Sequence, residues 1–301
     1  MCSITVITSI YDSHVFLEGY FKAVGEIENI HEIEILLIHN APKENELTII
    51  NKYLPEFSFI KYISVAEREG LYESWNRAIK LAKGKYLAVW NVDDIRTPGS
   101  LISQRTALVN SSAAMCYGDF YGTDNYGCFE ERLYQYSEYQ TLKKAALRRH
   151  IIGCFPMWRK EIHQSIGFFD EQFRLVGDFE FQIRVALKYD LVKADSFLGY
   201  YLENKNHKLS SNRKLQDKER TVVELRYRIY DKVMLHLIPF ISGFRTSQVL
   251  CSGNWIHLNK IVPSSNRVNL NNVFSFMAAP FTYTFWLIKK TLIKVYHFIL
   301  Y

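Results

Sequence analysis

The sequence lacks the features that define several common protein classes. Its five cysteines are scattered, odd in number and without a CxxC pair, so they indicate neither a disulfide framework nor a zinc site and favour a reducing compartment. No GxGxxG follows a predicted strand and no GxxxxGKS or GxxxxGKT occurs, which disfavours a dinucleotide-dependent oxidoreductase and a P-loop NTPase. The chain opens on strand-like residues, without the basic flank and apolar run of a signal peptide, and this predicts a cytoplasmic protein.

What the sequence does have is the composition of a globular protein with a large core. Of its 301 residues, 48% are hydrophobic and 23% are charged. The formal net charge of +6 fits nucleic acid, an anionic membrane surface or a phosphorylated substrate. The basic residues are not gathered into a stripe with interleaved aromatic residues, so no nucleic-acid partner is predicted.

Short apolar strands alternate with amphipathic helices along the first part of the chain. Strands are predicted at residues 3–8, 34–39, 57–64, 85–90 and 113–117. Helices are predicted at residues 13–27, 43–54 and 71–83, and Gly84 is expected to cap the last of them. This alternation predicts an α/β fold with a mostly parallel central sheet flanked by helices, whose ligand crevice lies at the carboxyl ends of the strands.

The character of the sequence changes near Asn204. A charged helical stretch runs from Asp217 to about Val233, and it is followed by a segment rich in Asn and Ser and then by an aromatic, basic C-terminus. We therefore predict a catalytic domain at residues 1–204 and a helical accessory segment at residues 205–301.

A first group of acidic residues follows a predicted strand directly. Asp93 and Asp94, preceded by Asn91, come after the apolar run 86–90. Carboxylates at the carboxyl end of a strand suit a hard cation such as Mn²⁺ or Mg²⁺, which keeps positions open for phosphate oxygens. The alternative is that these residues only form a turn and cap the next helix.

A second acidic residue, Asp178, lies at the start of a predicted helix. A carboxylate there can face the crevice and accept a proton from an incoming hydroxyl group. The alternative is an ordinary N-terminal acid stabilised by the helix dipole.

Taken together, these two sites and their surroundings resemble family-two glycosyltransferases, a large inverting group with the GT-A fold that includes enzymes of bacterial polysaccharide and lipopolysaccharide synthesis. The resemblance covers roughly residues 3 to 211, and the order and spacing of its motifs agree. The matching segments are Ile7-Thr8-Ser9-Ile10-Tyr11-Asp12, Leu37-Ile38-His39-Asn40, Arg68 to Asn76, Ala82-Lys83-Gly84-Lys85-Tyr86, Asn91 to Asp94, Thr97-Pro98, Arg159-Lys160, Gly167-Phe168-Phe169-Asp170-Glu171, and Gly177-Asp178 with Arg184.

The resemblance implies a role for each matched position. Asp178 would be the catalytic base, and Asp93 would be the principal ligand of Mn²⁺ or Mg²⁺, with His207 beside the metal and the diphosphate. Asp94 and Asp178 would line the acceptor site. The nucleotide sugar would be bound by Thr8, Tyr11, Asn40, Arg68, Asn76, Asn91, Asp93 and Asp94. The alternative for His207 is an ordinary surface-loop histidine.

Three positions depart from the family pattern. Asn91 replaces the first acid of the metal motif, His39-Asn40 replaces the usual acidic pair after the second strand, and Gly177 replaces the Glu that commonly precedes the base. These changes leave the nucleobase open, because Asn can pair with more than one base edge. Activity is still expected, since Asp93, Asp94 and Asp178 are retained.

The function implied is metal-dependent, inverting transfer of a sugar from a nucleotide diphosphate to an acceptor hydroxyl, in cell-surface polysaccharide or lipopolysaccharide assembly. Two alternatives remain. One is a catalytically degenerate scaffold or binding protein, suggested by Asn91 and Gly177. The other is a nucleotidyltransferase, although residues 9–13 lack the Gly-rich basic loop usual in that class.

The C-terminal run 273–288 is apolar but short, contains Pro280, and leads into Lys289, Lys290 and Lys294. It is marginal for a membrane-spanning helix, which needs about twenty apolar residues. Peripheral attachment to the inner face of the plasma membrane is favoured, with a glycan or lipid-linked glycan as acceptor. The alternative is a helical hairpin packed on the catalytic domain.

Overall fold

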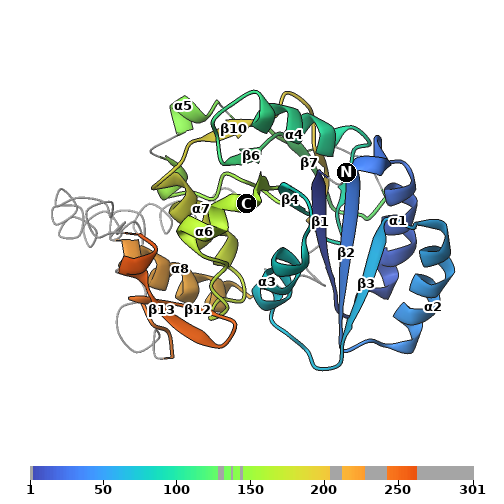
Figure 1. Ribbon diagram of the computed structural model, residues 1–301, viewed down its shortest axis with the longest axis horizontal. Coiled ribbons are helices and arrows are strands. Elements are labelled where there is room, and N and C mark those ends of the chain that lie inside the picture. Colours follow the sequence, from blue (N-terminus) through green and yellow to red (C-terminus); the bar gives the residue numbers. More distant parts are fainter. Residues whose placement is uncertain are drawn as a thin grey trace, which may run out of the picture.

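The predicted α/β class is confirmed by a computed structural model, which describes residues 3–127, 132–136, 138–142, 145–203, 212–227 and 243–262. A central sheet has helices on both of its faces (Figure 1). His207 and the run 273–288 lie outside the described residues. Among those residues, no helix is both long and apolar enough to span a membrane.

Seven strands of the described residues form the main sheet, in the order β10-β6-β9-β4-β1-β2-β3. Their bounds are β1 Ile4–Ile10, β2 Ile33–Asn40, β3 Ile60–Val65, β4 Tyr86–Val89, β6 Met115–Tyr117, β9 Met157–Arg159 and β10 Leu191–Lys193. The pairings are parallel except at β9, which runs antiparallel between β4 and β6. The sheet is therefore mostly parallel, as predicted, with one inserted antiparallel strand.

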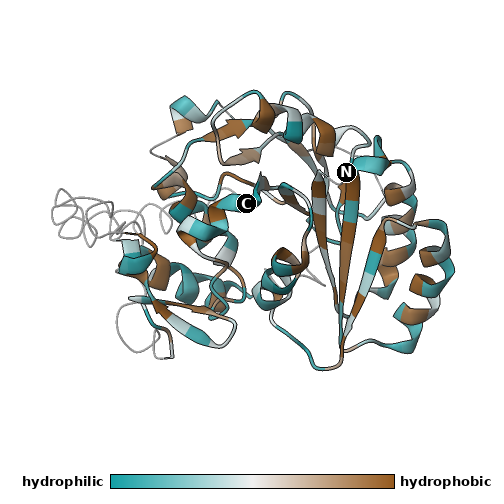
Figure 2. Ribbon diagram, viewed as in Figure 1, coloured by the Kyte–Doolittle hydropathy of each residue, from teal (hydrophilic) through white to brown (hydrophobic). Residues whose placement is uncertain are grey.

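The helices bury apolar side chains against the two faces of this sheet. Their bounds are α1 His14–Gly25, α2 Glu44–Tyr53, α3 Leu71–Leu81, α4 Ser100–Val109, α5 Tyr139–Leu142, α6 His163–Ile166, α7 Gly177–Ala186 and α8 Arg213–Tyr227. One core joins α1, α2 and α4 to the sheet face that bears Val6, and the other joins α3, α7 and α8 to the face that bears Ile7. Alternate residues of a strand point to opposite faces, which is why two neighbours serve two cores. Figure 2 shows apolar residues concentrated on these strands.

Gly84 does not cap α3, contrary to the sequence-based prediction. The helix ends at Leu81 and its C-cap residue is Ala82. Gly84 instead lies against β1, where a Cβ atom would come within 2.5 Å of the Thr5 backbone nitrogen. Glycine is needed here for close approach of two backbones rather than for helix termination.

Two smaller β structures were not predicted. Strands β5 Ile95–Arg96, β11 Gly199–Leu202, β7 Phe120–Thr123 and β8 Arg132–Tyr134 form a second sheet in the order β5-β11-β7-β8. Strands β12 Gln248–Cys251 and β13 Asn254–His257 form a hairpin. β5 follows the Asp93-Asp94 loop directly, so the second sheet fixes the far side of that loop.

Helix α8 lies beyond the predicted domain boundary near residue 204, yet its buried residues belong to the same core as α3 and α7. Val222, Val223 and Tyr227 of α8 are fully buried in that core. The boundary itself stays a prediction. Helix α8 contacts α7, the helix that carries Asp178, through Arg226 and Tyr227, which both bond to Glu180.

Candidate active site

The loops that carry the predicted site residues gather at the carboxyl edge of the main sheet. β1 pairs with β2 on one side and with β4 on the other, all parallel. Asn40 ends β2, and Tyr11 and Asn91 lie just after β1 and β4, so the three residues share one edge of the sheet, which is where parallel sheets bind their ligands.

The Asp93-Asp94 loop has one carboxylate held by the protein and one that is partly exposed. Asp94 is 1% exposed, and its two oxygens accept from the Leu202 backbone N–H at 3.3 Å and from Asn91 Nδ2 at 3.1 Å. The indole of Trp90 donates to the Asp94 carbonyl at 2.9 Å. Asp93 is half-buried beside them. Asn91 and Asp94 thus shape the loop that presents Asp93.

Tyr126, which the sequence did not single out, lies close to both acids. Burial, together with the charges of Asp93 and Asp94, raises the pKa of its phenol well above the ordinary value. Its hydroxyl donates to the Phe16 carbonyl at 3.2 Å, and its ring packs edge-on against Phe16. No sequence motif marks Tyr126, because only the tertiary fold places it beside the acidic loop.

The residues of this loop bear on whether a divalent metal could bind here. In the described part of the chain, no cluster of three or more His, Cys, Asp or Glu side chains is arranged to hold a metal ion. Mg²⁺ and similar cations need no such cluster, since they are commonly held by one or two carboxylates together with substrate phosphates and water. Asp93, which is half-buried at the carboxyl edge of the sheet, fits that mode.

Asp178 lies in the first turn of α7 and is held by neighbours from two other segments. Its Oδ1 accepts from the Tyr72 hydroxyl at 3.2 Å and from the Phe179 N–H at 2.8 Å. Its Oδ2 is 3.4 Å from Nε2 of His150, an atom that has no hydrogen-bond partner among the described residues. The Asp178 side chain remains 29% exposed. One carboxylate oxygen is therefore fixed, and the other faces a histidine and solvent.

Tyr72 also accounts for the glycine that precedes Asp178. A Cβ atom on Gly177 would lie 2.6 to 2.8 Å from the Tyr72 ring. That ring is 2% exposed and stacks on Phe169 with a centroid distance of 5.7 Å, so it cannot move aside easily. Burial, with the charge of Asp178, raises the pKa of Tyr72 well above its ordinary value, and the phenol stays a hydrogen-bond donor. The departure at Gly177 makes room for the tyrosine that contacts Asp178.

The loops after β1, β2 and β3 bring an aromatic ring and two cations together. The Arg68 guanidinium lies 3.9 Å from the centroid of the Tyr11 ring, and Lys43 Nζ lies 5.9 Å from it. Lys43 also pairs with Asp12 at 2.7 Å, and this contact lowers the pKa of that exposed carboxyl. Tyr11 is 37% exposed. The structure joins Tyr11 and Arg68, as the motifs suggested, and adds Lys43 to them.

Three other predicted nucleotide-binding side chains make hydrogen bonds inside the protein. Thr8 bonds to the Tyr20 hydroxyl at 2.8 Å. The Asn40 amide donates to Ser74 at 2.9 Å and to Ser9 at 3.2 Å and accepts from the Glu69 N–H. The Asn76 amide bonds to both backbone groups of Phe169 and to Glu171, at 2.8 to 2.9 Å. The structure engages these side chains in holding loops in place, and their contact with a nucleotide stays a prediction.

His39, the departure after β2, is a fully buried residue. Its Nε2 lies 3.0 Å from Glu46 and its Nδ1 lies 3.0 Å from the Tyr62 hydroxyl. The other oxygen of Glu46 accepts from the Ser13 N–H at 2.7 Å. The histidine thus ties β2 to α2 and to the loop after β1.

The segment that leads into Asp178 is fixed by α8. Glu219, fully buried, accepts from three consecutive backbone N–H groups, those of Arg174, Leu175 and Val176, at 2.8, 2.8 and 3.1 Å. Arg226 of α8 reaches Asp170 and Glu180, each at 2.8 Å. Helix α8 is therefore tied to both ends of the segment before α7.

Comparison with known proteins agrees with this arrangement. Residues 5–167 match the model of Glycosyl transferase family 2. An uncharacterised glycosyltransferase of Methanocaldococcus jannaschii is 25% identical over 189 residues, which cover 60% of this chain and 63% of that protein. The chain thus spans less than two thirds of the length of that curated relative.

Two solved structures share the fold. S. aureus TarS 1–349 in complex with UDP-GlcNAc has a TM-score of 0.62 at 14% identity, covering 92% of this chain and 79% of that one. The mannosyltransferase PcManGT of Pyrobaculum calidifontis, in complex with GDP-Man and Mn²⁺, has a TM-score of 0.56 at 12% identity, covering 99% of this chain and 80% of that one. Since the family match takes in more than half of the residues, the chain belongs to glycosyl transferase family 2.

Proposed function

We propose that the protein is a metal-dependent, inverting glycosyltransferase that moves a sugar from a nucleoside diphosphate donor to an acceptor hydroxyl. The observation that carries the proposal is the environment of Asp178. One of its oxygens is fixed by Tyr72 and the Phe179 N–H, and the other is directed at His150 and partly open to solvent. A carboxylate held in this way can take a proton from a bound hydroxyl group without reorienting.

The chain's residues divide the work between donor and acceptor. Asp178 Oδ2 would take the proton from the acceptor hydroxyl while the oxygen of that hydroxyl attacks the anomeric carbon on the face opposite the diphosphate. Nε2 of His150, left without a hydrogen-bond partner in the described residues, would bind the acceptor or an intervening water. The Tyr11 ring with Arg68 and Lys43 would bind the nucleotide, since cations and an aromatic face suit a base and its phosphates.

Asp93 is the residue we propose to hold Mn²⁺ or Mg²⁺ jointly with the diphosphate, and His207 would lie beside it. A bound cation would supply neutralisation of the negative charge that grows on the leaving diphosphate. Asp94 would keep the Asp93 loop in place, because its two oxygens accept hydrogen bonds from Asn91 and from the Leu202 N–H. It would also line the acceptor site.

The acceptor we propose is a glycan or lipid-linked glycan of cell-surface polysaccharide or lipopolysaccharide, used at the cytoplasmic face of the membrane. Support comes from the family and from the sequence of residues 273–301, with its aromatic run and following lysines. TarS binds UDP-GlcNAc and PcManGT binds GDP-Man, so both uracil and guanine donors belong in the first test.

That test is a thermal-shift panel of UDP, GDP, dTDP and CMP sugars, each with Mn²⁺, with Mg²⁺ and with chelator, followed by transfer assays with the donor that binds. A ligand that binds only the native state raises its melting temperature. We expect one base to be preferred, a shift that depends on metal and on Asp93, and a loss of transfer of about 100-fold or more in Asp178→Asn with donor binding retained.

The exposed Asp195→Asn, which also removes one carboxylate, is the matched control and should transfer at the wild-type rate. A scaffold would bind ligands equally well with and without Asp178 and would show no transfer in either protein. A nucleotidyltransferase would release pyrophosphate from a nucleoside triphosphate, and detection of pyrophosphate would contradict the proposal.

A further inference from the structure

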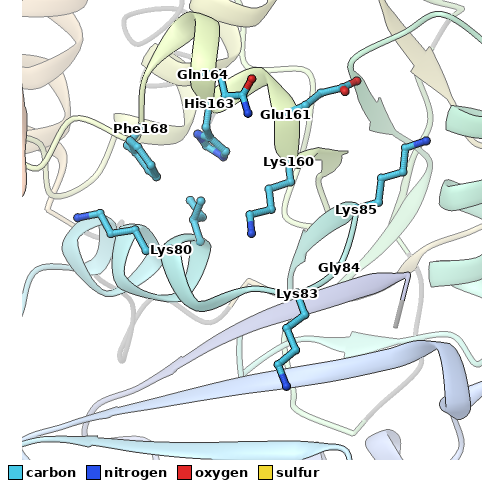
Figure 3. Close-up of a pocket in the computed structure, with 10 residues that line it drawn as sticks. Lys80, Lys83, Gly84, Lys85, Lys160, Glu161, His163, Gln164 and Phe168 are labelled. Carbon is cyan, nitrogen blue, oxygen red and sulfur yellow. The ribbon is translucent and has the colours of Figure 1, made fainter. Parts of the chain in front are cut away.

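A second candidate binding site lies at the opposite edge of the main sheet from Asp93. An open cavity of about 710 Å³ is formed by the end of α3, the connection 83–85 before β4, and the segment 160–168. In Figure 3, Phe168 and His163 face α3 across the gap and Lys160 extends into it, whereas Lys80, Lys83 and Lys85 extend outward from its rim. The Asp93 loop follows the carboxyl end of β4, whereas this cavity adjoins its amino end. The site is therefore separate from the proposed active site.

Positive charge dominates the lining of this cavity. Lys80, Lys83, Lys85 and Lys160 contribute to it, against one carboxylate, that of Glu161. No carboxylate in the described part of the chain lies within 4 Å of any of the four ammonium groups, whereas Lys43, Lys52 and Lys193 each have such a partner. Lys80 contacts the Ser252 hydroxyl and Lys160 the Ala82 carbonyl, which are neutral groups. The positive charge is therefore not compensated locally.

The helix end explains part of this arrangement but not all of it. A lysine near the C-terminus of a helix is stabilised by the helix dipole, and this accounts for Lys160 at the Ala82 carbonyl and for Lys80 in the last turn. Lys83 and Lys85 lie beyond the helix and are exposed. Gathering four cations around one concavity costs electrostatic repulsion, and a bound anion would offset that repulsion.

The wall between the lysines is apolar. Ile79 is 1% exposed, and Phe168 stacks on His163 with a centroid distance of 5.0 Å, while Lys80 Nζ lies 5.6 Å from the Phe168 centroid. His163 adds no charge. Its Nε2 accepts from Trp158 at 2.8 Å, its Nδ1 bonds to the Gly167 carbonyl at 2.9 Å, and burial lowers its pKa to about 4. The cavity is thus cationic at its rim and apolar at its wall.

We propose that this cavity binds a phosphate ester attached to an apolar group. Lysine ammonium groups on flexible stems bind phosphate oxygens as point charges, and the Ile79-Phe168 wall would take the alkyl or aromatic part. The headgroup region of an anionic phospholipid and a soluble phosphate ester share this chemistry. The proposal does not depend on glycosyl transfer, because none of the residues involved is part of the proposed active site.

The test is lysine acylation footprinting of the full chain, read residue by residue by mass spectrometry. The probes are inorganic phosphate, soluble dihexanoyl phosphatidic acid, phosphatidylglycerol vesicles and neutral phosphatidylcholine vesicles. Lys80 and Lys83 should be protected by dihexanoyl phosphatidic acid, whereas the exposed Lys22 and Lys61, on α1 and β3, serve as internal controls and should not change. Protection by phosphatidylglycerol vesicles as well identifies a membrane lipid as the source, and protection by the soluble ester alone identifies a soluble ligand.

The variant Lys80→Gln/Lys83→Gln should bind dihexanoyl phosphatidic acid about 25-fold more weakly, at roughly fivefold per lysine. Lys22→Gln/Lys61→Gln makes the same change in net charge and should bind like wild type. Equal weakening in both variants would mean nonspecific attraction to a basic protein and would overturn the proposal. Absence of protection at Lys80 and Lys83 with every probe would overturn it too.

Discussion

At the scale of single residues, the site departs from its family pattern in ways that the structure connects. Gly177 stands where a Glu is common, and the space above it is filled by the Tyr72 ring, whose hydroxyl reaches Asp178. Tyr72 comes from α3 and Asp178 from α7. The absence of a side chain at position 177 is therefore matched by a hydrogen bond to Asp178 from a distant helix.

We expect Tyr72→Phe to lower kcat about tenfold, with little change in the KM for the donor. The substitution keeps the packing of the ring but removes one hydrogen bond to a charged group, which contributes about 1.5 kcal/mol. Steady-state kinetics with the donor identified by the thermal-shift panel would measure this. Tyr189→Phe, which removes a hydroxyl bonded to Ser165, is the control and should leave both constants unchanged. A Tyr72→Phe enzyme with wild-type kcat would show that the hydroxyl does not position Asp178.

Sequence could nominate candidate acids but not their neighbours in the fold. Asp93 and Asp178 stand out because each follows or opens a predicted element, which is local information, and their roles stay predictions. His150, Tyr126 and Lys43 reach the site only through tertiary contacts, and no motif marks them. Asn40 and Asn76 were predicted as nucleotide ligands, and in the folded protein their amides hold neighbouring loops, which no local pattern indicates.

At the scale of elements, helix α8 supports the helix that carries Asp178. The three N–H groups bound by Glu219 belong to consecutive residues just before α7. Farther along, Arg226 joins Asp170 and Glu180. Although burial opposes it, the nearby Arg184 and Arg226 lower the pKa of Glu180, so this carboxylate stays ionised and paired. The start of α7 is thereby held by a segment outside the family match.

Glu219→Gln is expected to loosen this support. One carboxylate oxygen becomes an NH₂ group, which faces backbone donors and leaves at least one buried N–H unsatisfied, at a cost of about 1–3 kcal/mol. Hydrogen exchange at the amides of residues 174–176 should become about tenfold faster or more, and kcat should fall while donor binding is kept. Asp217→Asn on the exposed side of α8 is the control. Unchanged exchange at these amides would contradict the role given to Glu219.

Elements with a long, regular pattern were predictable and the others were not. Strands β1, β2 and β4 and helices α1, α2 and α3 were predicted to within a few residues, because their apolar pattern is local. Strands β7, β9, β11 and β12 have three or four residues each, like β4, but they stand outside the alternation of strands and helices that marked β4. Their pairing partners are distant in sequence, so their place depends on the assembled sheets.

At the scale of the whole molecule, stability should respond to acid through a buried histidine. His163 is packed between Phe168 and Phe181, with burial lowering its pKa from 6.5 to about 4. The unfolded chain binds a proton on this ring more readily than the folded protein does. The stability that the neutral ring contributes is therefore present above pH 6.5 and is lost as the pH falls toward 4.

Between pH 7 and pH 4, the free energy of unfolding of the wild type should fall by about 3 kcal/mol more than that of His163→Gln. Glutamine keeps an acceptor for the Trp158 indole but cannot be protonated in this range. Urea denaturation of both proteins at several pH values measures the difference, and carboxylates common to both cancel. Parallel pH curves would show that His163 is not the group responsible.

The antiparallel strand β9 has a consequence for how the protein is made. It lies between β4 and β6, so the edge of β4 stays open until residues 157–159 have been synthesised. Until then, the native partner of β4 on this side is missing, which leaves an unpaired apolar edge on the nascent chain. The part of the sheet that joins β4 to β6 therefore cannot form before about the middle of the chain has been synthesised.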